Sequence, residues 1–158
     1  MLLFAMALAL TFLITNSSFA TCPEGMVAYW NLDETVPGTY EDFFNANDGT
    51  GNLDPTPAAG IVGGAQSFNG TNTGITVPAH PTFGWYQNQL FSIEFWVKRD
   101  DAVPVAGDPE VVIGRYESAT TLRWWVGITN TQVVQFQLTA TNNTQRNVTG
   151  TTNVVDGD

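Results

Sequence analysis

The chain has 158 residues, and its 15 acidic against five basic side chains give a net charge of −10 at pH 7. This excess of carboxylates argues against nucleic acid and anionic membrane surfaces as partners, because both need basic side chains. One cysteine, Cys22, excludes an intramolecular disulfide. One histidine, His80, and that cysteine are together too few for a zinc site of the usual kind.

The N-terminus has the pattern of an export signal. Residues 1–14, MLLFAMALALTFLI, form an uncharged apolar run that is too short to cross a bilayer. Ser18-Phe19-Ala20 follows with the small-x-small pattern of a cleavage site. We therefore expect residues 1–20 to be a signal peptide and residues 21–158 to be one exported domain, secreted or at the cell surface, without a membrane span.

After residue 21 the chain is rich in Thr, Asn, Gly, Val and aromatic residues, which favour strands and turns over helices. Several segments have a period of two, so that side chains of one parity share a face. The expected strands are Met26–Glu34, Phe91–Lys98, Leu122–Thr129 and Val133–Thr139, with shorter ones at Gln66–Phe68, Ile75–Val77 and Val111–Arg115. Many short strands separated by turn residues predict an antiparallel sandwich or barrel.

The glycine-rich stretch Gly60–Pro78 does not have the spacing of a phosphate-binding loop, and no helix follows it. It predicts a hairpin in which Ala65–Phe68 and Ile75–Val77 are the strands and Asn69–Thr73 is the turn. In this interpretation Phe68 faces the core. The remaining long segments, Thr35–Pro57, Ala79–Asn88 and Arg99–Pro109, are expected to be loops.

Four motifs occur in a recognisable order, namely Val27–Glu34 as first strand, Asn47-Asp48-Gly49-Thr50, Gly63–Gly70 and Phe91–Lys98 as a central strand. Together they resemble the laminin G-like jelly-roll domains of the concanavalin A-like lectin/glucanase superfamily, as found in exported bacterial proteins. The resemblance covers almost all of Met26–Asp158 and implies an antiparallel β-sandwich of jelly-roll type. In that family a Trp-His-His-Val strand follows a turn such as Asp156-Gly157-Asp158, so we expect the C-terminal strands to be missing from this chain.

The resembled fold hosts lectins, glycosidases, lyases and adhesion modules, so it does not decide the function. A retaining glycosidase needs two carboxyl groups about 5–5.5 Å apart. The Glu-x-Asp-x-x-Glu strand of laminarinase-type enzymes does not occur here. Glu94 is the only acid within a long predicted central strand, and Lys98 shares its face. We therefore expect no catalytic site in this chain.

The polar faces of the predicted strands carry two indole rings among amide and charged groups. Sugar rings stack their C–H faces on aromatic rings, and their hydroxyl groups bond to amides and charges. The predicted ligand-binding residues are Glu94, Trp96, Arg123, Trp125, Gln135 and Gln137. The alternative is that the two tryptophans pack beneath loops or form a second layer of the core.

Two predicted loops are rich in carboxylates, which are the ligands that calcium takes from loops. Many relatives of the resembled fold bind calcium, although no EF-hand spacing occurs here. The candidate calcium ligands are Asp33, Asp42 and Asp48 around one loop, and Asp100, Asp101, Asp108 and Glu110 around another. The alternative is that these acids are solvated surface groups.

From these patterns we expect a non-catalytic recognition module of an exported or cell-surface protein, which binds glycans or extracellular protein partners. One alternative is an accessory or catalytic domain of a polysaccharide-degrading enzyme. Another alternative is a purely structural spacer.

Overall fold

The computed structural model describes residues 22–44, 46–85, 89–99, 109–118 and 121–155. The predicted signal peptide and three of the calcium candidates, Asp100, Asp101 and Asp108, lie outside these ranges. The one helix within them is a short 3-10 turn, η1 (Pro81–Phe83). Accordingly, none of the described segments forms a helix with the length and apolar character needed to cross a membrane.

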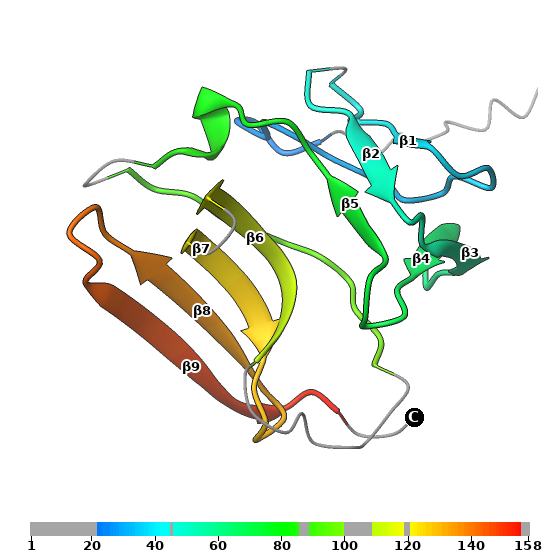
Figure 1. The fold of residues 1–158 in the computed structure, drawn as a ribbon. Coiled ribbons are helices and arrows are strands. Elements are labelled where there is room, and N and C mark those ends of the chain that lie inside the picture. The colour runs from blue at the N-terminus through cyan, green and yellow to red at the C-terminus, as the bar shows by residue number, and fades with distance from the viewer. Residues whose placement is uncertain (1–21, 45, 86–88, 100–108, 119–120, 156–158) are drawn as a thin grey trace, which may run out of the picture.

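Nine strands in the described ranges form three antiparallel sheets (Figure 1). The first sheet contains β1 (Thr39–Tyr40), β2 (Gly49–Asn52) and β5 (Gly74–Thr76), and the second contains β3 (Thr56–Ala59) and β4 (Gly64–Ser67). The third runs in the order β6 (Glu110–Ser118), β7 (Thr121–Ile128), β8 (Val133–Thr139) and β9 (Gln145–Asn153). The expected antiparallel all-β class is confirmed, and the sheets are open in the part of the chain that is described.

The strand β8 occupies its predicted segment, and β7 begins and ends one residue before its predicted one. Their register places alternate apolar residues on one face of the sheet. That face carries Trp124, Val126 and Ile128 from β7 opposite Leu138, Phe136 and Val134 from β8. The three β7 side chains are buried. β6 contains its predicted segment and extends beyond it. β9 is an additional strand that its sequence, QRNVTGTTN, does not predict, because Val148 is its single strongly apolar residue.

A stack of aromatic rings covers this apolar face. Trp85 stacks on Trp124 with ring centroids 4.7 Å apart, and on Phe91 at 3.8 Å. Phe91 in turn contacts Phe136 of β8 at 5.6 Å. The indole Nε1 of Trp124 also donates a hydrogen bond to the carbonyl oxygen of Phe83 at 3.1 Å. A second layer over the four-stranded sheet is therefore formed by Phe83, Trp85 and Phe91.

The predicted first strand, Met26–Glu34, is not a strand apart from an isolated antiparallel bridge between Trp30 and Asp42. Its alternation is nevertheless visible in the burial, because the odd-numbered residues from 27 to 33 are exposed and the even-numbered ones from 26 to 34 are less so. Leu32 has a φ of 58°, in the left-handed region that non-glycine residues rarely adopt. At Leu32 the backbone therefore departs from the extended conformation, and a continuous β-ladder cannot pass through it.

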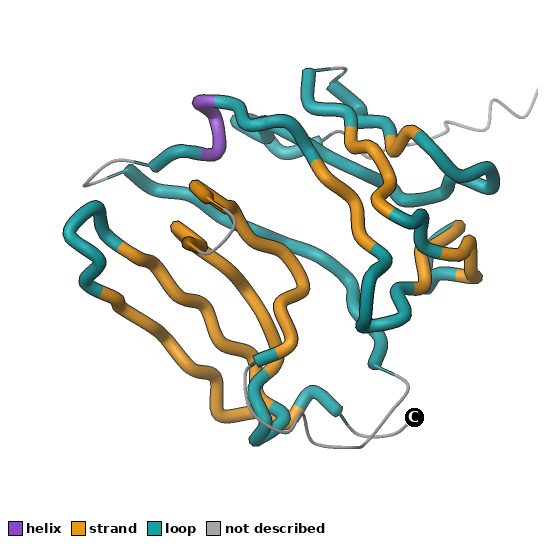
Figure 2. The backbone as a smooth tube through the Cα atoms, viewed as in Figure 1, coloured by secondary structure: helices purple, strands orange, loops and turns teal. Residues whose placement is uncertain are grey.

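The predicted central strand, Phe91–Lys98, is also not a strand in the described residues. Figure 2 draws it as a loop, and Figure 1 shows it passing from the end of the four-stranded sheet where η1 lies towards the opposite end. Phe95 and Val97, which the alternation assigns to the core, are 40% and 47% exposed. Alternation alone does not supply a neighbouring strand, so this prediction was wrong for the chain as described.

The predicted hairpin between Ala65–Phe68 and Ile75–Val77 is wrong. β4 pairs with β3 and β5 pairs with β2, so the two strands belong to different sheets. The connection is organised by Asn69, whose Oδ1 accepts hydrogen bonds from the backbone N–H groups of Thr71–Thr73 at 2.9–3.2 Å. This side-chain-stabilised loop replaces a hairpin turn, and Phe68 is 48% exposed instead of facing the core.

The predicted loop Thr35–Pro57 contains β1, β2 and the start of β3. It is closed by Asp54, whose Oδ1 accepts hydrogen bonds from the hydroxyl group of Tyr40 at 3.3 Å and the N–H of Gly38 at 3.0 Å. Tyr40 is only 1% exposed. Burial, together with the negative charge and the hydrogen bond of Asp54, raises the pKa of Tyr40, so the phenol stays a hydrogen-bond donor.

Gly51→Ala is expected to lower the free energy of unfolding by about 2 kcal/mol, because a Cβ at Gly51 would overlap the Asp54 carboxylate. That carboxylate cannot move aside without losing its bonds to Gly38 and Tyr40. Gly74→Ala is the matched control, because a Cβ there meets nothing within 4 Å, and it should change stability by less than about 0.5 kcal/mol. Urea denaturation measures both free energies of unfolding. Equal stability of the two variants would contradict the close packing of Asp54 against Gly51.

Candidate functional site

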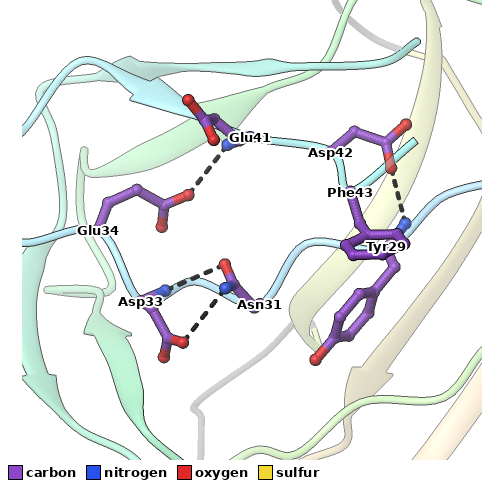
Figure 3. Close-up of a pocket in the computed structure, with 7 residues that line it drawn as sticks. All are labelled: Tyr29, Asn31, Asp33, Glu34, Glu41, Asp42 and Phe43. Atoms are coloured by element: carbon purple, nitrogen blue, oxygen red, sulfur yellow. Dashed lines mark hydrogen bonds between the residues drawn. The ribbon is translucent and has the colours of Figure 1, made fainter. Parts of the chain in front are cut away.

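A cleft of about 380 Å³ lies where the N-terminal segment passes the residues that follow β1 (Figure 3). The cleft is lined by Tyr29, Asn31, Asp33, Glu34, Glu41, Asp42 and Phe43. The two segments are held together by the Trp30–Asp42 bridge and by a hydrogen bond from the N–H of Phe43 to the carbonyl oxygen of Tyr29 at 2.8 Å. Three residues on the exposed side of the first segment, Tyr29, Asn31 and Asp33, thus line the cleft together with residues that follow β1.

Asp42 is the buried member of the lining, with no exposed surface. Its Oδ1 accepts hydrogen bonds from the N–H groups of Tyr29 at 2.9 Å and Phe44 at 3.2 Å, and its Oδ2 accepts one from Nδ2 of Asn47 at 3.0 Å. Burial acts to raise the pKa of Asp42, but the hydrogen bonds from Tyr29, Asn47, Phe44 and Ala46 outweigh it and lower the pKa. Asp42 is therefore an ionised, fully bonded structural carboxylate.

The residues after Asp42 fix the turn that carries Phe43. Oδ1 of Asp48 accepts a hydrogen bond from the N–H of Asp42 at 2.9 Å. Asn47 is only 3% exposed, and its carbonyl oxygen accepts a hydrogen bond from the indole Nε1 of Trp30 at 2.9 Å. These contacts connect the turn to Trp30 on the opposite segment and help to hold the two segments of the cleft together.

The acidic side of the cleft is arranged by backbone donors. Oε1 of Glu34 accepts a hydrogen bond from the N–H of Glu41 at 2.9 Å, whereas Oε2 of Glu34 is buried without a donor among the described residues. Asp33 accepts hydrogen bonds from the N–H of Gly64 and from Nδ2 of Asn31. Because each carboxylate oxygen has more than one lone pair, this wall keeps spare acceptor capacity.

The aromatic side of the cleft consists of Tyr29 and Phe43. Their rings meet edge to face, with centroids 6.3 Å apart and an interplanar angle of 60°. Tyr29 is 44% exposed and Phe43 is 65% exposed. Figure 3 shows both rings at one end of the cleft, with Asp33 and Glu34 at the other. Two solvent-accessible rings therefore line the same cleft as several hydrogen-bond acceptors.

Four of the six predicted ligand-binding residues, Arg123, Trp125, Gln135 and Gln137, share one face of β7 and β8, with Trp125 paired to Gln137 and Gly127 to Gln135. Trp125 is only 6% exposed, however, in agreement with the alternative that its indole is packed. The other two residues, Glu94 and Trp96, lie in the segment 89–99, which has no strand pairing to β7 or β8 in the described residues. Trp96 is 81% exposed, so the two indoles do not form one platform.

The polar residues on this face of the sheet are engaged with their neighbours. Arg123 forms an ion pair with Glu117 and donates a hydrogen bond to the carbonyl oxygen of Ala140 at 2.8 Å. Nε2 of Gln135 donates to Oγ1 of Thr149 at 3.1 Å. These contacts connect neighbouring strands, so these polar side chains bond to other groups of the sheet.

The calcium candidates within the described residues are in contact with other groups of the protein. Backbone N–H groups donate hydrogen bonds to the carboxylates of Asp33, Asp42 and Asp48. Glu110 is paired with Arg99, whose Nε lies 2.7 Å from Oε2. No group of three or more Asp, Glu, His or Cys side chains suited to a metal ion occurs in the ranges that the structure describes.

Five residues of the cleft are neither predicted ligand-binding residues nor calcium candidates, namely Tyr29, Asn31, Glu34, Glu41 and Phe43. One signal for them is present, because the alternation of Val27–Asp33 places Tyr29 and Asn31 on the exposed face. No comparable signal marks Glu41 and Phe43, whose position depends on the bridge to Trp30.

Comparison of the chain with protein-family models, with curated proteins and with solved structures finds no match.

Proposed function

We propose that the protein is a non-catalytic recognition module of an exported or cell-surface protein, and that it binds glycans in the cleft beside Tyr29 and Phe43. The observation that carries the proposal is the pairing of two exposed aromatic rings with a wall of hydrogen-bond acceptors in one cleft. Sugars present C–H faces to such rings and hydroxyl donors to such acceptors.

The acceptors have roles that differ with their surroundings. Asn31, Asp33 and Glu41 are exposed and are available to the hydroxyl groups of a bound sugar. Oε2 of Glu34, in contrast, is buried and is not accessible to a bound sugar. A neutral glycan fits this wall better than an anionic one, because carboxylates repel a ligand of the same charge.

The chemistry of Asp42 supports binding rather than hydrolysis. A glycosidase needs one carboxylic acid that keeps its proton near neutral pH, which requires a raised pKa. The pKa of Asp42, the most buried carboxyl group of the cleft, is lowered instead, and its oxygens are occupied by hydrogen bonds from the protein. We therefore favour recognition over the alternative of a catalytic domain.

We also propose the laminin G-like jelly roll as the finer fold class. The antiparallel pairing of all three described sheets supports it, because a jelly roll is built from antiparallel strands in two packed sheets. The ring contact of Phe91 with Phe136, on the apolar face of the four-stranded sheet, supports a second layer over that face.

Affinity electrophoresis in gels that contain soluble neutral polysaccharides tests the proposed glycan binding. The protein should be retarded by at least one polysaccharide of a panel of β-glucans, xylans, mannans and galactans. Tyr29→Ala and Phe43→Ala should each weaken that retardation about five- to tenfold, the value of roughly 1–1.4 kcal/mol for one aromatic contact.

Trp96→Ala is the matched control, because Trp96 is an exposed aromatic residue outside the cleft. It should leave the retardation unchanged, and circular dichroism should show all three variants folded. Loss of retardation in Trp96→Ala with retention in the two cleft variants would transfer the site to Trp96. Absence of retardation by every polysaccharide would remove the proposal.

A further inference from the structure

In the described part of the chain, β9 is an edge of the four-stranded sheet. It pairs there with β8 on one side only, and all nine of its residues are exposed. Natural sheets protect such edges with charges, prolines or short strands, because free N–H and C=O groups accept another strand. β9 has no proline, and its only charged residue is Arg146.

The first half of β9 is the regular half. Gln145–Thr149 follows an uninterrupted register against Thr139–Gln135 of β8, whereas the register shifts between Thr149 and Asn153. Such an irregularity bends a strand and hinders the addition of a neighbour. A strand added to this edge therefore pairs with Gln145–Thr149.

An apolar side chain lies uncovered beside this regular half. Val148 is 72% exposed, and the register places it opposite Phe136, on the face of the sheet that carries the aromatic stack. Leu138, opposite Arg146, is 38% exposed on the same face. A strand added at this edge would cover Val148 as well as satisfy the backbone.

The charge distribution indicates which strand pairs with the free edge of β9. Two copies of a chain with a net charge of −10 repel each other over most of their surface, but β9 contains no carboxylate. An antiparallel pair centred on Asn147 is self-complementary: Gln145 meets Thr149, and Arg146 meets Val148, in both directions. The aliphatic part of Arg146 then covers Val148 of the other copy.

We infer that Gln145–Thr149 of β9 pairs antiparallel with the same segment of a second copy, about a twofold axis at Asn147, so that two four-stranded sheets become one continuous sheet. This inference concerns assembly and does not depend on the glycan cleft. The isologous arrangement is the commonest way in which soluble chains form dimers.

Two substitutions at Val148 test the inference in opposite directions, with sedimentation equilibrium over a range of protein concentrations as the measurement. Val148→Lys places a cation opposite Arg146 of the other copy and should raise the dimer dissociation constant about tenfold, since two like-charged cross-strand pairs arise by symmetry. Val148→Glu places an anion there and should lower the dissociation constant by a similar factor.

The two substitutions also separate this edge from association elsewhere. Without a specific contact, Val148→Lys reduces the negative net charge and favours association, whereas Val148→Glu opposes it, so the signs would be reversed. The inference would be overturned if the two dissociation constants changed with reversed signs or were equal. It would also be overturned if the wild-type protein stayed monomeric in a series of 100-fold concentration steps that ends at about millimolar concentration. Circular dichroism checks that both variants retain the fold.

Discussion

Asp42→Asn is expected to lower the free energy of unfolding by about 3 kcal/mol, because it replaces a buried, multiply bonded carboxylate. The Asn side chain keeps one carbonyl oxygen, so its NH2 group meets either the N–H groups of Tyr29 and Phe44 or Nδ2 of Asn47. At least one of these buried groups then loses its acceptor. Chemical denaturation followed by tryptophan fluorescence measures the loss.

Glu24→Gln is the matched control, since it also removes one negative charge but does so at an exposed position. Its effect should be below about 0.5 kcal/mol. If Asp42→Asn were as stable as Glu24→Gln, the carboxylate would not hold the two segments of the cleft together.

The pH dependence of stability follows from the lowered pKa of Asp42. A group whose pKa is lower in the folded than in the unfolded state stabilises the fold above the unfolded value, which is about 3.9 for Asp. That stabilisation is lost as the pH falls from this value through the folded pKa. The difference in the free energy of unfolding between the wild-type protein and Asp42→Asn should therefore decrease below about pH 4. A difference that does not change with pH would contradict the lowered pKa of Asp42.

Trp124→Ala is expected to have the larger effect, a loss of about 4 kcal/mol. The side chain is only 7% exposed, stacks on Trp85 and bonds to the carbonyl oxygen of Phe83. Its removal leaves a cavity beneath the aromatic layer and an unpaired carbonyl group. Thermal denaturation should show a correspondingly large decrease of Tm.

Two further variants make the result specific. Trp124→Phe keeps an aromatic ring but loses the indole N–H, so its stability should lie between the wild type and Trp124→Ala. Trp96→Ala removes the same kind of side chain from an exposed position and should change stability by less than about 0.5 kcal/mol. Equal effects at Trp96 and Trp124 would contradict the packing described for the sheet.

The strands β7 and β8 were predictable because their apolar residues recur at every second position, on the face that the aromatic stack covers. β9 was not predictable in this way, because both of its faces are exposed and its sequence is polar. The short strands β1 and β2 depend on long-range contacts, above all on Tyr40 and Asp54, and leave no local pattern. The hairpin prediction failed because the side chain of Asn69 stabilises a loop that the sequence also permits.

The site was less predictable than the fold. The predicted platform required Trp96 and Trp125 to share a surface, and this depended on pairing between Phe91–Lys98 and the sheet. The carboxylates of Asp33, Asp42 and Asp48 were predicted to lie around one loop, but a sequence does not show whether such a group meets a cation or a backbone N–H. In the structure they accept backbone hydrogen bonds, and these bonds shape the cleft.

The most direct test of the account is a ¹⁵N-¹H NMR titration of the protein with a neutral oligosaccharide derived from the polysaccharide that retards it. We expect the largest chemical-shift changes at the amide groups of Tyr29, Asn31, Glu41 and Phe43, with little change at the indole of Trp96. Changes centred on Trp96 or on the outer face of β7 and β8, with none at the cleft, would contradict the account.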